Sequence, residues 1–122
     1  MRRKRKRKVL SVIVPAYRQE RTIKNDLINI ISTLREGLDN YGFEIICVVD
    51  GFLDKTFEKA KEIKSPELKV VGYRKNKGKG YAVRYGMSEA SGELISFLDA
   101  GMDISPKGIM MLMAHMDWYD AD

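Results

Sequence analysis

Two carboxylates that follow a short apolar run are the residues of this sequence best suited to chemistry. Residues 93–98 read Glu-Leu-Ile-Ser-Phe-Leu, and Asp99 and Asp103 come shortly after them. An apolar run of this length predicts a strand buried on both faces of a sheet, with Asp99 at its carboxyl end. Open α/β sheets bind their ligands at that edge, where acidic side chains can hold a hard divalent cation against a phosphate.

Acidic loops follow two other apolar runs as well. Loop 15–20 and loop 50–54 each come directly after such a run and carry carboxylates. A single aspartate after a strand is commonly only a helix cap. In a parallel sheet, however, the carboxyl ends of all strands lie along one edge. We therefore expect Tyr17, Asp50 and Asp99 to converge there on a polar ligand.

A basic, glycine-bearing loop at residues 74–80 is a candidate for binding phosphate. It does not match the dinucleotide fingerprint, because the third glycine would fall at Val83. It does not match a P-loop either, because Gly80 occupies the position that needs Ser or Thr. Its backbone N–H groups and cations can still bind a diphosphate, and a flexible turn with solvated lysines is the alternative. The cations are Arg74, Lys75, Lys77 and Lys79.

The single cysteine and the single histidine exclude several kinds of site. Cys47 alone cannot form an internal disulfide, and the pair cannot supply a His-based zinc site or a Cys/His nucleophile. We expect Cys47 to be a small core residue and His115 to be structural. The methionines of the segment 110–116 are expected to fill the core, with a membrane-facing or partner-binding face as the alternative.

Strand and helix patterns alternate four times along the chain, which predicts the elements that position these residues. The strands are expected at residues 9–15, 43–49, 68–73 and 93–98. The helices are expected at about residues 22–36, 54–63 and 81–90, and from residue 105 onward. This alternation predicts an α/β, Rossmann-like fold with a mostly parallel sheet and helices on both faces. Thr22 and Asp54 are the expected helix caps.

Length and charge limit the domain organisation. The chain has 122 residues, enough for one domain, and 44% of them are hydrophobic. The net charge of +5 comes from residues 1–8, which hold seven basic side chains, whereas the rest carries 15 basic against 17 acidic side chains. We expect a disordered basic tail, with an anionic lipid surface or nucleic acid as its alternative partners. Nucleic acid is the least favoured partner, because no aromatic residues interleave the charges.

Four segments, in this order, resemble family 2 glycosyltransferases, whose nucleotide-binding half is of the GT-A type. They are residues 11–17 (Ser-Val-Ile-Val-Pro-Ala-Tyr), 48–51 (Val-Val-Asp-Gly), 76–84 and 97–100. The chain is most similar to the polyprenyl-phosphate sugar synthases, of the dolichol-phosphate mannose or glucose synthase type. The resemblance implies that residues 9–122 are the nucleotide-sugar-binding part of a GT-A domain that is truncated at its C-terminus.

The resemblance also implies roles for single residues. The nucleotide base and ribose are expected next to the loop after the first strand and next to the aspartate after the second strand. The donor phosphates are expected next to the lysine of the basic loop. The implied donor-binding residues are Pro15, Ala16, Tyr17, Glu20, Asp50, Lys79, Asp99 and Ala100.

The implied metal site departs from the family's pattern. Asp99 matches the first Asp of the D-x-D motif, but Gly101 stands where the second Asp is expected. In some sugar-phosphate synthases of the family the residue two positions further on also reaches the metal, so we expect Asp99 and Asp103 to share Mg²⁺ or Mn²⁺. A second departure is Arg18, which stands where the family usually has Asn.

The implied reaction is transfer of a sugar from a UDP- or GDP-sugar to an acceptor, with inversion. The acceptor is expected to be a polyprenyl phosphate or a glycan, and a divalent cation neutralises the diphosphate leaving group. The catalytic residue is unknown; any general base is expected in the C-terminal half, so this chain alone should transfer nothing. We expect a cytoplasmic protein, peripheral on the cytoplasmic membrane face. The alternative is a degenerate nucleotide-binding module without catalysis.

Overall fold

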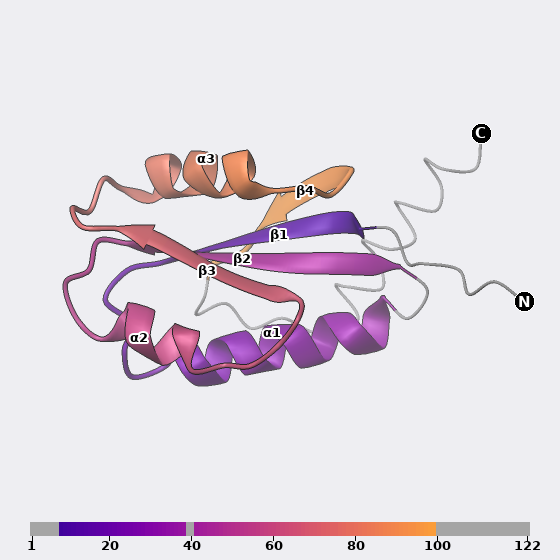
Figure 1. Cartoon of the computed structure of the whole chain (residues 1–122), viewed down its shortest axis with the longest axis horizontal. Coiled ribbons are helices and arrows are strands. Elements are labelled where there is room, and N and C mark those ends of the chain that lie inside the picture. Colours follow the sequence, from indigo (N-terminus) through magenta and orange to yellow (C-terminus); the bar gives the residue numbers. More distant parts are fainter. Residues whose placement is uncertain (1–7, 39–40, 100–122) are drawn as a thin grey trace, which may run out of the picture.

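The structure of this chain is a computed structural model that describes residues 8–38 and 41–99 (Figure 1). The predicted alternation of strands and helices is confirmed in this part of the chain, and the helix expected from residue 105 lies outside it. The strands are β1 (Lys8–Ala16), β2 (Gly42–Asp50), β3 (Leu68–Tyr73) and β4 (Leu94–Phe97). The helices are α1 (Ile23–Gly37), α2 (Thr56–Lys61) and α3 (Lys79–Glu89).

The four strands form one parallel sheet in the order β3-β2-β1-β4. Helices α1 and α2 cover one face and α3 covers the other, as Figure 1 shows. The predicted Rossmann-like architecture is therefore confirmed. The chain runs outward from β1 to β3 and then crosses back through α3 to place β4 on the other side of β1. The reversal of strand order makes the carboxyl ends of β1 and β4 a topological switch point, where such sheets bind ligands.

Two apolar layers hold the sheet between its helices. On one side, α1 contributes Ile23, Leu27, Ile30 and Leu34, which recur every three or four residues and are fully buried. Alternate residues of β2 serve the two layers, because successive side chains of a strand point to opposite faces. Ile45 packs toward α1, whereas Ile46 packs toward α3. Burying one such side chain contributes roughly 1.5–3 kcal/mol, so these layers hold the strand ends that form the edge.

Cys47 is fully buried in the layer under α1, as expected for a core residue. Burial raises the pKa of its thiol to about 12, because the thiolate is poorly solvated there. The thiol is therefore protonated at neutral pH, and it packs as a small apolar group.

The strand β4 differs from the prediction of a strand buried on both faces. Its side chains Leu94, Ile95 and Phe97 are 45%, 43% and 54% exposed. Within residues 8–38 and 41–99, β4 lies at the edge of the sheet and pairs with β1 alone. An apolar run predicts a strand, but its place in the sheet depends on strand order, which no local pattern contains.

The start of β4 is anchored by a buried carboxylate at the amino end of the sheet. Glu44 Oε2 accepts hydrogen bonds from the Ser11 hydroxyl at 2.6 Å and from the Ser91 N–H at 2.6 Å. The Ser11 hydroxyl also accepts the N–H of Gly92 at 2.8 Å. These bonds tie the turn between α3 and β4 to the two central strands, so they set where β4 begins.

The helices begin close to their predicted positions. Thr22 occupies the expected N-cap position of α1, but its side chain makes no capping hydrogen bond. Lys55 occupies the N-cap position of α2, so the prediction of Asp54 as its cap is wrong; Asp54 lies one residue earlier, and its Oδ1 accepts the N–H of Thr56 at 2.9 Å. Helix α3 begins at Lys79, two residues earlier than expected. Among the described residues, no helix has the length and apolar composition needed to cross a bilayer.

Candidate functional site

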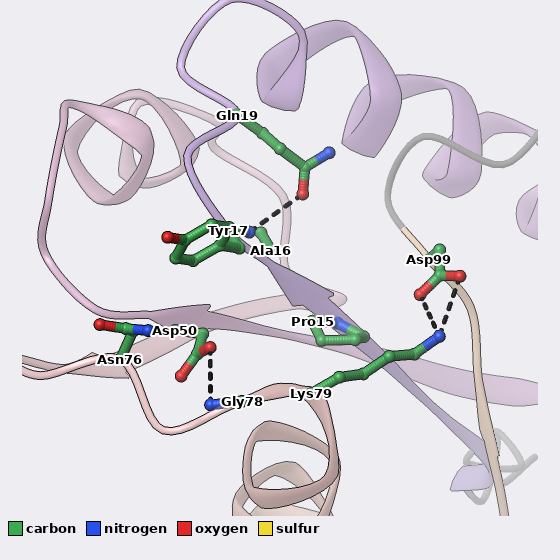
Figure 2. Close-up of a pocket in the computed structure, with 9 residues that line it drawn as sticks. All are labelled: Pro15, Ala16, Tyr17, Gln19, Asp50, Asn76, Gly78, Lys79 and Asp99. Atoms are coloured by element: carbon green, nitrogen blue, oxygen red, sulfur yellow. Dashed lines mark hydrogen bonds and ion pairs between the residues drawn. The ribbon is translucent and has the colours of Figure 1, made fainter.

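A cavity of about 460 Å³ lies at the carboxyl edge of the sheet, between the ends of β1 and β4 (Figure 2). Tyr17, Asp50 and Asp99 all line it, so the predicted convergence of these residues is confirmed. The full lining consists of Pro15, Ala16, Tyr17, Gln19, Asp50, Asn76, Gly78, Lys79 and Asp99.

The loop after β1 presents an aromatic ring to the cavity. Tyr17 is 48% exposed, and its backbone N–H donates a hydrogen bond to Gln19 Oε1 at 3.1 Å (Figure 2). The N–H of Gln19 in turn donates to the Thr56 hydroxyl at 2.8 Å, which fixes the loop to the start of α2. An exposed ring held by a fixed loop can stack against a flat ligand such as a nucleotide base.

Arg18 has a left-handed backbone conformation, with φ at +48°. Asn, Asp and His are the non-glycine residues enriched in this region of φ/ψ space. The Arg18 guanidinium lies 5.9 Å from the centroid of the Tyr17 ring, within range of a cation–π contact. The departure from Asn noted in the sequence thus falls at a position where the backbone itself favours Asn.

Asp50 organises the basic loop rather than pointing freely into the cavity. It is 5% exposed, and its Oδ1 accepts hydrogen bonds from the Tyr73 hydroxyl (2.8 Å) and the Lys77 N–H (2.7 Å). Its Oδ2 accepts the Gly78 N–H at 3.0 Å (Figure 2). The prediction that the loop offers its backbone N–H groups to a diphosphate is therefore wrong for Lys77 and Gly78. Gly78 has a φ of +95°, which lets both N–H groups turn toward one carboxylate.

Lys79 and Asp99 form an ion pair across the cavity (Figure 2). The Lys79 Nζ lies 2.8 Å from Asp99 Oδ1 and 3.0 Å from Asp99 Oδ2. Lys77 points elsewhere, with its ammonium 5.0 Å from the centroid of the Tyr81 ring. Of the four cations predicted in loop 74–80, Lys79 is the one that lines the cavity.

Glu20 does not line this cavity, although it was expected in the donor site. It borders a neighbouring hollow with Arg18 and Asp54. Its Oε1 accepts the N–H of Lys55 at 2.9 Å, so it connects the loops that follow β1 and β2. This contact joins segments 35 positions apart, so no local pattern of the sequence contains it.

Three lining residues were absent from the predicted site. Asn76 and Gly78 lie in residues 76–84, one of the four segments that resemble family 2 glycosyltransferases, so this resemblance could have identified them. Gln19 had no such signal, because its contribution is a hydrogen bond to a backbone N–H two residues earlier.

The described part of the predicted metal site is a single carboxylate. Asp99 lines the cavity, whereas Ala100, Gly101 and Asp103 lie outside the described residues. No group of three or more His, Cys, Asp or Glu side chains suited to a metal occurs within residues 8–38 and 41–99. Mg²⁺ is commonly bound through one or two carboxylates together with substrate phosphates. Asp99 therefore fits a cation site that a bound diphosphate completes.

Solved structures with the same arrangement define the class of protein. S. aureus TarS (residues 1–349) matches with a TM-score of 0.72 and 26% identity, over 89% of this chain and 32% of that one. Glucosyl-3-phosphoglycerate synthase from Mycobacterium tuberculosis, in complex with Mn²⁺ and UDP, matches with a TM-score of 0.67 and 26% identity, over 89% and 39%. Mannosyltransferase PcManGT from Pyrobaculum calidifontis, in complex with GDP-Man and Mn²⁺, has a TM-score of 0.61 and 26% identity, over 75% and 27%. The chain has the nucleotide-binding part of a GT-A glycosyltransferase fold.

The family follows from the sequence comparisons. The family model described as glycosyl transferase family 2 matches residues 11–122, and the chain belongs to this family, as its resemblance predicted. Dolichol-phosphate mannosyltransferase of Pyrococcus furiosus is 34% identical over 105 residues, 85% of this chain and 29% of that protein. Dolichyl-phosphate β-glucosyltransferase of Drosophila melanogaster is 38% identical over 98 residues, 75% of this chain and 30% of that protein. The chain thus spans less than a third of the length of these relatives.

Proposed function

We propose that the full-length protein transfers a sugar from a UDP- or GDP-sugar to polyprenyl phosphate, with inversion. The observation that carries this proposal is the cavity of a family 2 chain, in which Tyr17, Lys79 and Asp99 come together from separate elements. Relatives that are dolichol-phosphate mannosyl- and glucosyltransferases support a lipid-phosphate acceptor. Structural neighbours in complex with UDP or GDP-Man support a nucleoside diphosphate donor.

The lining of the cavity divides between the two ends of such a donor. Tyr17, with Pro15 and Ala16 behind it, offers the flat, partly apolar surface that a base and ribose require. Asp50 acts mainly by holding the basic loop in place. Lys79 supplies a positive charge for the diphosphate at the start of α3. We keep Ala100 in the proposed donor site from the resemblance, and we place Glu20 beside the site as a support of its loops.

Asp99 would hold Mg²⁺ or Mn²⁺, with Asp103 as the second ligand that the resemblance implies. When bound, the cation supplies Lewis-acid stabilisation of the diphosphate leaving group. Mn²⁺ in two structural neighbours supports this choice of cofactor. The chain's own contribution is to orient the nucleoside against Tyr17 and to balance the phosphate charge with Lys79.

We also propose that the protein acts on the cytoplasmic face of a membrane. Residues 1–8 carry seven basic side chains, and each basic residue near an anionic leaflet contributes about 1 kcal/mol to binding. A polyprenyl-phosphate acceptor lies in such a surface, so the tail would bring the site close to its substrate. A shift in the sedimentation of the full-length protein with phosphatidylserine vesicles, lost when residues 2–8 are deleted, would support this placement.

The test is calorimetric titration of the full-length protein with UDP and GDP, each with and without Mn²⁺. We expect one of the two nucleotides to bind, and to bind tighter with the metal. Incubation with the matching nucleotide-sugar and a polyprenyl phosphate should then move labelled sugar into the lipid fraction. If nucleotide affinity is the same with and without Mn²⁺ and no sugar is transferred, the protein is a binding module instead of an enzyme.

A further inference from the structure

We propose that the Lys79 ammonium is the built-in counter-ion of Asp99 in the free protein, and that it gives way to a divalent cation when the donor binds. Lys79 would then move from the carboxylate to the diphosphate. This inference rests on the proposed function, since it assumes that the cavity takes a nucleoside diphosphate. It concerns what the two side chains do before that ligand arrives.

The pair has the geometry of a full charge-to-charge contact. The Lys79 Nζ approaches both oxygens of Asp99, at 2.8 Å and 3.0 Å, so it lies against the oxygen-bearing face of the carboxylate, and both residues line the cavity. The residues are 20 positions apart, at the start of α3 and just beyond β4, so the contact arises from the fold and not from a local turn. A cation that binds this face of Asp99 must displace the ammonium.

A second contact holds Lys79 over the same carboxylate. Its Nζ lies 5.8 Å from the centroid of the Phe97 ring, two residues before Asp99. Phe97 is 54% exposed, so its ring is a surface on which the lysine side chain can rest. Both contacts lie at the carboxyl end of β4, so the Lys79 side chain packs against this end of the strand in the free protein.

The charges around the cavity explain why an exchange is needed. Asp50 is already satisfied by three hydrogen bonds, whereas Asp99 faces Lys79. A diphosphate entering this cavity would bring further negative charge close to Asp99. One lysine cannot neutralise both anions, so a divalent cation on Asp99 would release Lys79 for the phosphates.

The pair is also weak enough to exchange. Both side chains are about half exposed, at 56% and 50%, and exposed ion pairs of this kind change an equilibrium by about fivefold or less. Lysine suits the task because its charge is compact and its four-carbon stem is flexible. Without nucleotide, Lys79 therefore competes with the cation for Asp99. With nucleotide, the diphosphate is a stronger partner for Lys79 than Asp99 is.

The test compares three versions of the full-length protein: wild type, Lys79→Met and Lys77→Met. Lys77→Met is a matched control, because it removes one charge from the same loop while its ammonium lies over Tyr81 and not at Asp99. Mn²⁺ binding is measured without nucleotide by electron paramagnetic resonance of the free ion. Binding of UDP and GDP is measured separately, without metal, by calorimetry.

We expect Lys79→Met to bind Mn²⁺ about three- to tenfold tighter than wild type, since a competing ion pair and a repelling charge are both removed. Lys77→Met should stay within about twofold of wild type. In the metal-free titration, Lys79→Met should lose on the order of tenfold in nucleotide affinity, because a charge-assisted contact to the diphosphate is gone.

The exchange would be overturned if Lys79→Met bound Mn²⁺ no more tightly than wild type, including the case in which neither protein binds the ion. An equal gain in Lys77→Met would overturn it too, because the effect would then be one of net charge. Failure of the proposed function looks different: the wild type would bind neither UDP nor GDP under any condition. Nucleotide binding with unchanged Mn²⁺ affinity in Lys79→Met would therefore refute the exchange alone.

Discussion

The Tyr73 hydroxyl donates a hydrogen bond of 2.8 Å to the carboxylate of Asp50, and so joins the ends of β3 and β2 beneath the basic loop. The same carboxylate receives the N–H groups of Lys77 and Gly78. The tyrosine is thus one of three donors that fix the loop from which Lys79 reaches the cavity. A residue outside the cavity lining therefore supports the position of a residue inside it.

Replacing Tyr73 by Phe should weaken both the fold and the site. We expect the free energy of unfolding to fall by about 1 kcal/mol, because a partly buried hydrogen bond to a charged group is lost. Nucleotide affinity should fall severalfold as the loop loosens. Urea unfolding and calorimetry measure the two effects. Tyr85→Phe is the control, because it removes a hydroxyl from the neighbouring ring, whose centroid lies 5.3 Å from that of Tyr73. Equal effects of the two substitutions would contradict the role of the Asp50 bond.

The same bond predicts a dependence on alkaline pH. Burial, and then the hydrogen bond to Asp50, raise the pKa of Tyr73 above its ordinary value. An acid whose pKa is raised by folding contributes its full stability below the unfolded pKa of about 10 and loses it as the pH rises further. The difference in unfolding free energy between wild type and Tyr73→Phe should thus be constant from pH 7 to about pH 9 and shrink above about pH 10. A difference that grows with pH would contradict the assigned direction.

Arg18 offers a stabilising substitution. Its φ of +48° is a conformation that costs most side chains about 1–2 kcal/mol and suits Asn better. Arg18→Asn should therefore raise the free energy of unfolding by about 0.5 kcal/mol in a urea titration, part of the gain being offset by the lost contact with the Tyr17 ring. Arg21→Asn, three residues further on, should give no such gain. A loss of stability in Arg18→Asn would show that the guanidinium contacts outweigh the backbone.

Gly86 permits the close approach of α3 to the sheet. A Cβ at this position would clash with the Ile13 Cγ2 and lie 3.0 Å from the Val48 Cγ2, and both of these side chains are fully buried. Gly86→Ala should lower the unfolding free energy by about 1–2 kcal/mol, since overpacking outweighs the better helix propensity of alanine.

Gly80→Ala tests the same substitution in the same helix without the clash. The nearest atom to its added Cβ is the Arg84 guanidinium, at 3.8 Å. It should be neutral or raise the unfolding free energy by up to about 1 kcal/mol. The two variants together separate packing from propensity in a single denaturation series, and a stabilised Gly86→Ala would show that α3 can move away from the sheet.

The sequence predicted most of what depends on local pattern. The bounds of β3 were predicted as they stand, at Leu68–Tyr73, because an apolar run there ends in clear loop residues. The meeting of Tyr17, Asp50 and Asp99 was predicted because parallel strands bring their carboxyl ends to one edge. Both results follow from periodicity and one rule of topology.

The predictions that failed concern features that depend on how distant segments are arranged in space. The exposure of Phe97 follows from the edge position of β4, and strand order is not written in any single segment. The engagement of Asp50 with two backbone N–H groups requires a turn at Gly78 whose shape only the assembled loops define. Glu20 lies beside the cavity, where its carboxylate accepts the N–H of Lys55, a residue 35 positions away in the sequence.

The two walls of the cavity differ in how firmly they are built. Tyr17 extends from β1, a strand bonded on both sides, whereas Asp99 extends from β4, which within the described residues is bonded on one side only. Amide protons of β4 should therefore exchange with solvent sooner than those of β1. On warming, the wall that carries Asp99 should therefore lose its order before the wall that carries Tyr17, and under the proposed function cation binding would weaken before nucleoside binding does.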